Sequence, residues 1–408
     1  MGIPSRHLWA AIPTAFSAGF LLCGYEFVRG PSITLFKAAY GTENLPVAMA
    51  LMPLGVILLL YLYSRALSLL GPRRTLLVTT LASGAMIALC YAAVRAGSSL
   101  AIGALYVFRQ AYIVLIIEQY WSFINSTFGR DSARKLNGPI AGVASLGAIS
   151  GGMLVGALAR PLGSATLVLF AAASVIPTAI LSDFAYAKCG EPQPSEDEKG
   201  GRHGHMGLGE FRRSRPLLFL FLVIVATQVV SVGLDLRFQG ILQNAIPDVD
   251  KQTSFIGWFF AAVNSGAAFL QFVAAPILLR WLAIRTIHLG LPLIHAAACA
   301  ALIAHPSLET AAAAFLLFKC FDYSVFRAAK EILYIPLSFD ARYRAKEIID
   351  VFGYRFSKGG ASLVITLVQQ AGVILTSAYS FIALAGVMAW LGLIVPLMRH
   401  HEGTSGRP

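Results

Sequence analysis

Long apolar segments separated by short polar connections dominate the pattern of this chain. A helix that crosses a hydrocarbon core of about 30 Å needs about 20 mostly apolar residues. The pattern predicts twelve such helices, at residues 8–28, 46–66, 75–95, 100–124, 138–160, 164–186, 216–242, 254–279, 285–304, 310–335, 347–375 and 378–398. We therefore expect an all-α membrane protein.

The composition agrees with this interpretation. Of the 408 residues, 57% are hydrophobic and only 13% are charged, which excludes an ordinary soluble domain of this length. The formal net charge of +12 does not indicate nucleic-acid binding, because Lys and Arg accumulate in the cytoplasmic connections of membrane proteins and are attracted to anionic lipids.

Basic residues recur in alternate connections between the predicted helices. They are Arg6, Arg65, Arg73, Arg74, Arg130, Arg134, Lys135, Arg280, Arg285, Arg342, Arg344, Lys346 and Arg399. The other connections carry isolated charges such as Lys37, Arg95 and Lys251. The distribution predicts that both termini are cytoplasmic, and the short connections favour a bacterial inner membrane.

One long hydrophilic segment divides the chain near its middle. Residues 187–215 are rich in Gly, Pro and charge, which is typical of a flexible linker. We expect a helical bundle over 1–186, the cytoplasmic linker, a second bundle over 216–400 and a cytoplasmic tail over 401–408. No metal-ligand spacing and no nucleophile with a base occurs, so we expect neither a cofactor nor an enzyme.

The two halves repeat one another at a nearly constant offset. The matching pairs, 209 to 211 residues apart, are Glu26 and Asp235, Arg74 and Arg285, Phe108 and Phe318, and Arg134 and Arg344. Six helices repeated twice around a central linker resemble the major facilitator superfamily. That resemblance implies two pseudo-symmetric six-helix bundles with a solute site between them.

The stretch FKCFDYSVFRAAKEILYIPL, residues 318–337, carries unusual charge for a membrane span. One charged side chain at the bilayer centre costs about 2.5–3.5 kcal/mol, so this span is predicted to face protein or a water-filled cavity. At about 100° per residue, one face holds Lys319, Tyr323, Arg327, Lys330 and Tyr334, flanked by Asp322 and Glu331. In the next span, Asp350, Tyr354 and Lys358 are four residues apart.

Other predicted helices also carry charged or polar positions. Glu26 and Arg29 are three residues apart in the first span, Asp235 and Gln239 are four apart in the seventh, and Glu118 and Trp121 share a face in the fourth. These charges are interpreted either as structural ion pairs or as a solute site. Cations outnumber anions among them, so an anionic solute would complete the charge balance.

Two glycine pairs occur in the fifth predicted span. Gly147 and Gly151, and Gly152 and Gly156, are each four residues apart. Small residues at this spacing let helices approach closely in a membrane. We assign them to helix packing.

Three motifs resemble the ATP/ADP translocase family of plastids and intracellular bacteria. They are KEILYIPL (330–337), KEIIDVFG (346–353) and the Lys-Gly-Gly of 358–360, supported by YWSFIN (120–125) and LRFQGILQNAIPD (236–248). By this resemblance Lys330, Glu331, Tyr334, Pro336, Lys346, Asp350 and Lys358 hold family positions. Gly30, Pro31, Ser32 and Gly233 stand at or beside positions where that family carries charges, which implies a divergent member.

The first hypothesis is a secondary transporter that works by alternating access on an organic anion, for which a nucleotide is one candidate, or on a larger zwitterionic solute. Solute binding is assigned to Arg29, Trp121, Lys319, Tyr323 and Lys358; coupling or charge pairing to Glu26, Glu118, Asp235, Asp322 and Glu331; gating to Arg134, Lys135, Lys330, Arg344, Lys346 and Asp350. The expected partners are a small solute, membrane lipid and a coupled proton or counter-substrate.

Two alternatives stay open. In the first, the acids couple proton entry to uptake of a drug-, siderophore- or peptide-like solute. In the second, the protein is a membrane sensor or partner platform without flux, and its charged linker recruits a soluble partner.

Overall fold

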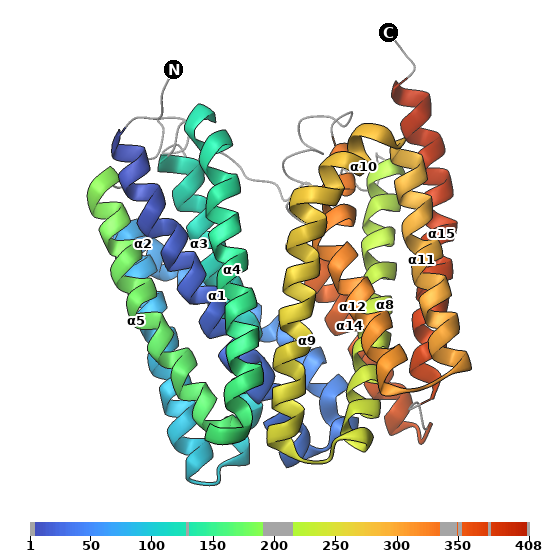
Figure 1. The fold of residues 1–408 in the computed structure, drawn as a ribbon, viewed down its shortest axis with the longest axis horizontal. Helices are drawn as coiled ribbons and strands as arrows, with labels where there is room; N and C mark the ends of the chain where they lie inside the picture. Colours follow the sequence, from blue (N-terminus) through green and yellow to red (C-terminus); the bar gives the residue numbers. More distant parts are fainter. Residues whose placement is uncertain are drawn as a thin grey trace. The chain divides into compact units, whose positions relative to one another are not determined.

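The computed structural model describes residues 5–127, 130–190, 215–334, 349, 353–373 and 377–405, and the chain is helical there apart from short turns (Figure 1). The α-helices are α1 (Ser5–Tyr40), α2 (Leu45–Arg95), α3 (Ser99–Thr127), α4 (Arg130–Leu162), α5 (Ser164–Cys189), α8 (Arg215–Ala245), α9 (Val249–Phe269), α10 (Ala275–Trp281), α11 (Ile284–Ala304), α12 (Leu308–Phe321), α13 (Arg327–Leu333), α14 (Tyr354–Gln370) and α15 (Ala378–Ser405). A 3₁₀ turn, η1 (Thr42–Asn44), precedes α2, and π-helical turns η2 (Leu270–Ala274) and η3 (Asp322–Phe326) interrupt two longer helices.

Nine helical segments in the described part of the chain are long and apolar enough to cross a membrane. One of them, Thr42–Arg95, contains two of the predicted spans. The charged segment 308–333 and α14 are not among the nine, although the sequence also predicts spans there. The membrane helices therefore follow the predicted pattern, and the charged spans are the ones that hydropathy alone does not select.

The connection between the second and third predicted spans is a kink inside α2. Gly71 has φ 74° and ψ 169°, a conformation that glycine adopts readily because it has no Cβ. Just beyond the kink, Arg73 donates to both carboxylate oxygens of Asp183 on α5, at 2.7 and 2.9 Å. This bidentate pair ties the second part of α2 to α5.

The helices pack into two compact units. The first comprises Met1–Gly200 with Ile246–Ser265, and the second comprises Gly201–Ala245 with Gly266–Pro408. The division therefore passes through α9, whose first part packs with the N-terminal half of the sequence. The domain boundaries expected from the linker stay a prediction.

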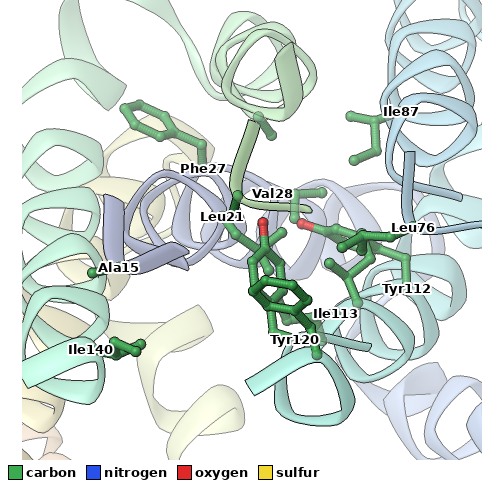
Figure 2. Close-up of a cluster of buried hydrophobic side chains, with 14 of the residues drawn as sticks. Ala15, Leu21, Phe27, Val28, Leu76, Ile87, Tyr112, Ile113, Tyr120 and Ile140 are labelled. Atoms are coloured by element: carbon green, nitrogen blue, oxygen red, sulfur yellow. The ribbon is translucent and has the colours of Figure 1, made fainter. Parts of the chain in front are cut away.

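In the first unit, α1 packs against α3, α4 and α5 (Figure 1). Its apolar residues continue around the helix: one side packs against these helices, and Trp9, Ile12, Phe16 and Phe20 are exposed on another. Figure 2 shows Leu21 and Val28 of α1 beside Tyr112 and Tyr120 of α3 in the buried cluster. Ser17 bonds the Tyr120 hydroxyl and donates to the Thr178 carbonyl at 2.7 Å, so these two buried hydroxyls are paired.

The glycines of α4 lie where neighbouring backbones come closest. A Cβ on Gly151 would lie 2.6 Å from the carbonyl oxygen of Cys23 on α1, and one on Gly152 would lie 2.8 Å from the backbone nitrogen of Ala261 on α9. Gly147 meets Gly19 of α1 in the same way. The glycine pairs therefore have the packing role predicted for them.

This packing predicts opposite effects for two alanine substitutions in α4. Gly151→Ala should lower the thermal stability of the purified protein by about 1–3 kcal/mol, because the α1 backbone must shift. Gly142→Ala, in the same helix, meets nothing within 4 Å of its Cβ, so it should stabilise the protein by about 0.5–1 kcal/mol. Thermal unfolding in detergent measures both, and equal effects would contradict the close-contact explanation.

In the second unit, α8 packs against α12, α14 and α15. Much of α8 is buried, and its polar positions Ser231 and Gln239 are buried with its apolar ones. The π-helical turns η2 and η3 contact one another. A π turn contains one residue more than an α turn, so each shifts the residues that follow it by about 100° around the helix.

Candidate functional site

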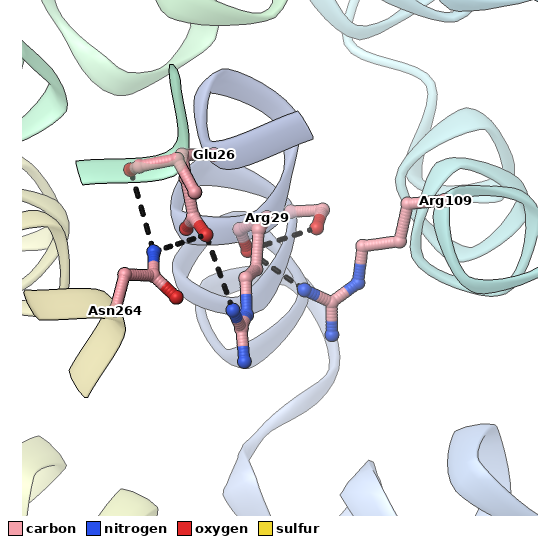
Figure 3. A network of polar contacts seen from close by, with 6 residues as sticks. Glu26, Arg29, Arg109 and Asn264 are labelled. Atoms are coloured by element: carbon pink, nitrogen blue, oxygen red, sulfur yellow. Dashed lines mark hydrogen bonds and ion pairs between the residues drawn. The ribbon is translucent and has the colours of Figure 1, made fainter. Parts of the chain in front are cut away.

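Four residues of the first unit form a buried network that we term the N-terminal polar cluster: Glu26, Arg29, Arg109 and Asn264 (Figure 3). Glu26 is 4% exposed and accepts hydrogen bonds from Arg29 Nη1 at 3.2 Å and from Asn264 Nδ2 at 3.0 Å. Arg109 Nη1 donates to the backbone carbonyl of Arg29 at 2.9 Å. Three helices, α1, α3 and α9, thus meet at one carboxylate and two guanidinium groups.

Aromatic rings line this cluster. The guanidinium carbon of Arg29 lies 3.3 Å from the ring centroid of Phe260 and 5.7 Å from that of Tyr25. The guanidinium carbon of Arg109 lies 4.5 Å from the Tyr106 ring. Such stacking stabilises a cation and holds its plane in one orientation. With two cations and one anion, the cluster suits an additional negative group.

The second unit contains a set that we term the C-terminal polar cluster: Ser231, Asp235, Lys319, Asp322, Lys330 and Lys358. Lys358 Nζ lies 3.4 Å from Asp235 Oδ2, and the two side chains are 22% and 14% exposed. Lys319 is 7% exposed and donates from Nζ to Ser231 Oγ at 3.0 Å. The helices α8, α12 and α14 therefore bring together charges that are far apart in sequence.

Asp322 is the acid of the π turn η3. Its Oδ1 is buried and has no hydrogen-bond partner among the described residues. Lys319, Arg327, Lys330 and Lys358 all act on its carboxylate electrostatically. Cations surround this acid and outnumber it.

Lys330 is buried in a pocket of aromatic rings. It is 2% exposed, and its ammonium nitrogen lies 5.0 Å from the ring centroid of Tyr354 and 6.0 Å from that of Tyr334. These contacts join α13 to the first turn of α14. The sequence assigned Lys330 to a gate, and its gating role stays a prediction.

The predicted polar face of span 10 is split in the structure. Lys319, Lys330 and Tyr334 are buried, whereas Tyr323 and Arg327 are exposed. A uniform α-helix would place these five residues on one side, but η3 inserts an extra residue into the turn between them. The sequence pattern gave no sign of this π turn.

The remaining predicted site residues are more scattered. On α3, Trp121 is partly buried against the apolar cluster of Figure 2, while Glu118 is exposed. Glu331 is partly buried and Lys135 is exposed. The Arg134 side chain and the residues Arg344, Lys346 and Asp350 lie outside the described part of the chain.

Several contacting residues were not assigned to a site from the sequence. They are Asn264 and Arg109 of the N-terminal polar cluster, Phe260, which stacks on Arg29, and Ser231, which accepts from Lys319. Asn264 is an amide within an apolar span, and a polar residue in such a place is itself a functional signal. Phe260 and Ser231 carry no comparable signal.

Comparison with known proteins finds a partial family match and a widely shared fold. Residues 256–401 match the family TLC ATP/ADP transporter. The ADP,ATP carrier protein 1 of Chlamydia muridarum is 26% identical over 217 residues, which cover 46% of this chain and only 40% of that carrier.

Solved structures of transporters share the fold over almost the whole chain. A mutant of the nucleoside transporter NupG has a TM-score of 0.69 at 10% identity, covering 96% of this chain and 99% of that one. A bacterial homologue of the iron transporter ferroportin has a TM-score of 0.69 at 13% identity, covering 96% and 98%. The peptide transporter PepTSo has a TM-score of 0.66 at 11% identity, covering both chains fully.

These matches confirm the fold class predicted from the twelve apolar segments. They also confirm the resemblance predicted from residues 330–360, which lie within the matched region. This chain is an integral membrane protein with the fold of the major facilitator transporters, and its residues 256–401 match the TLC ATP/ADP transporter family.

Proposed function

We propose that this protein is a secondary active transporter of an organic anion, with nucleotides as the first solute class to test. It works by alternating access, in which two helical bundles rock around one solute site. The fold and the family match over residues 256–401 support transport.

The main observation in favour of an anionic solute is the C-terminal polar cluster. Lys319 and Lys330 are nearly inaccessible, and Lys358 is partly buried beside Asp235. Burying charge in a membrane protein is costly, so such residues mark solute or ion pathways by default. Among the described residues of the cluster, three lysines stand against two acids, so a carboxylate or phosphate of the solute would complete the balance.

Roles follow from the chemistry of each side chain. In the second unit, Lys358 and Lys319 are the proposed contacts for anionic groups of a solute, and Tyr323 offers a ring face. In the first unit, Arg29 and Trp121 have the corresponding proposed roles. Glu118, Asp235, Asp322 and Glu331 are the charge partners that these cations release. The basic residues near the helix ends form gates on the cytoplasmic side, with both termini in the cytoplasm of a bacterial cell.

The buried position of Glu26 supports a second candidate mechanism, in which solute uptake is coupled to a proton gradient. It is a carboxylate with 4% exposure inside a membrane bundle, and it bridges Arg29 and Asn264. A buried acid of this kind can take up a proton when its cationic partner turns to the solute. Uptake driven by an inward proton gradient would then accompany or replace exchange.

The test is uptake of labelled ATP by proteoliposomes that contain the purified protein. One set is loaded with ADP, one is empty, and a third is empty with an inward proton gradient. Uptake that requires internal ADP supports nucleotide exchange, and uptake that requires the gradient supports proton coupling. No uptake of any nucleotide in the three sets, by protein shown to be folded, would contradict a nucleotide substrate.

A further inference from the structure

A cavity of about 560 Å³ lies between α4 and α9 within the first unit. Its lining includes two cations, Arg160 and Lys251, and three aromatic residues, Phe255, Trp258 and Phe259. Neither cation belongs to the polar clusters described above. The cavity is therefore distinct from the two polar clusters. It combines two cationic side chains with an apolar, aromatic wall.

The two cations lie at the ends of membrane helices. Arg160 is in the last turn of α4, which ends at Leu162, and Lys251 is in the first turn of α9, which begins at Val249. Both side chains are exposed. Ser164, which begins α5 directly after α4, donates to Asp250 beside Lys251, so these ends lie together. Charges at helix ends lie at the level of the lipid headgroups.

Small residues of α4 leave room in the cavity next to Arg160 and Lys251. Gly156 and Ala157 of α4 form part of the lining, and a Cβ on Gly156 would lie 2.7 Å from Trp258. Trp258 is 49% exposed, so it offers a ligand in the cavity an apolar ring face and a polar N–H edge, the combination typical of interfacial tryptophans.

The nearby acids are engaged by donors of the protein. Asp250 Oδ1 accepts the backbone N–H and the hydroxyl of Ser164, at 2.7 and 2.6 Å. Asp248 Oδ1 accepts the backbone N–H of Lys251 at 2.8 Å. Neither acid lines the cavity. The Lys251 ammonium and the Arg160 guanidinium are thus the charged groups of the cavity.

We propose that this cavity binds one anionic phospholipid. The phosphate lies between Arg160 and Lys251, and an acyl chain follows the groove along Phe255 and Trp258. A free phosphate would use the cations but leave the aromatic wall without a partner, so the combined lining favours a lipid. The proposal does not depend on which solute the protein transports.

The test uses the full-length protein in vesicles of phosphatidylcholine with a small fraction of brominated phosphatidylglycerol or brominated phosphatidylcholine. Bromine on the acyl chain quenches tryptophans that it contacts, and subtracting the signal of Trp258→Phe isolates Trp258. We expect brominated phosphatidylglycerol to associate at least about five-fold more strongly, since one cation near an anionic lipid surface contributes roughly that factor.

Three variants sharpen the result. Arg160→Gln with Lys251→Gln should abolish the preference, and Ala157→Phe should weaken it by filling the cavity without changing its charge or adding a tryptophan. Arg280→Gln should leave it intact, because Arg280 lies beside the exposed Trp281 on α10, outside the cavity lining. Equal quenching by both lipids in the unmodified protein would overturn the proposal, as would competition by soluble glycerol phosphate, which would assign the cavity to a free anion.

Discussion

Replacing Lys358 by Gln should reduce nucleotide uptake by at least about ten-fold. Nζ of Lys358 lies 3.4 Å from Asp235 Oδ2, and the side chain keeps 22% of its surface accessible, so an entering phosphate can exchange with the carboxylate. A hydrogen bond to a charged group contributes about 1.5–3 kcal/mol, and losing it from the bound state gives this factor. Initial uptake rates into proteoliposomes measure the effect.

A double substitution separates this role from a structural one. Lys358→Gln and Asp235→Asn alone should each lower the thermal stability, because each leaves one partner unpaired. The double variant should recover stability but not uptake. Recovery of uptake would show that Lys358 only neutralises Asp235. Lys188→Gln is the matched control, since Lys188 is an exposed lysine at the end of α5.

Replacing Glu26 by Gln should destabilise the first unit by about 3 kcal/mol. Glu26 is the acid of the N-terminal polar cluster, where it accepts from Arg29 and Asn264. Removing one member of a buried ion pair leaves the other charge uncompensated in a low-dielectric site. For a unit of this size the midpoint of thermal unfolding should fall by about 6 °C or more, which scanning fluorimetry in detergent measures.

The matched control is Glu43→Gln, because Glu43 is an exposed acid of the same unit. Its unfolding midpoint should stay within about 1 °C of the unmodified protein, as for most exposed substitutions. Adding Arg29→Gln to Glu26→Gln should restore part of the lost stability, since both charges of the pair are then absent. If Glu26→Gln alone left the unfolding midpoint unchanged, the Glu26–Arg29 pair would not be a stabilising ion pair in a water-excluded site.

The apolar segments predicted the membrane helices well because a hydrocarbon core imposes one length on every span. Similar reasoning predicted that segment 318–337 faces protein or a water-filled cavity, since its charges are costly against lipid; Lys319 and Lys330 are buried, whereas Tyr323 and Arg327 are exposed. It also paired Glu26 with Arg29, because positions three apart share a face of any α-helix. Each success rests on a local rule that tertiary context does not change.

The missed features depend on tertiary packing. At the π turn η3, Tyr323 is exposed while Lys319 and Lys330 are buried, although Lys319 Nζ still lies 5.3 Å from the Tyr323 ring centroid. Single-residue insertions of this kind leave no mark in apolar periodicity. The partner of Lys358 is Asp235, 123 residues earlier in the chain, and helix geometry alone cannot choose among distant partners. Asn264 joined Glu26 only because α9 packs on α1 and α4.

The course of α9 affects how this protein could be divided or rebuilt. Its first part, to Ser265, packs in the first unit, and the rest continues into η2 of the second. A fragment ending at the central linker would therefore lack Asn264 and Phe260 and would leave the glycine face of α4 without its partner helix. Residues 246–265 belong to the first unit, so exchange of a half between relatives must carry them with the first half to preserve the cluster around Glu26.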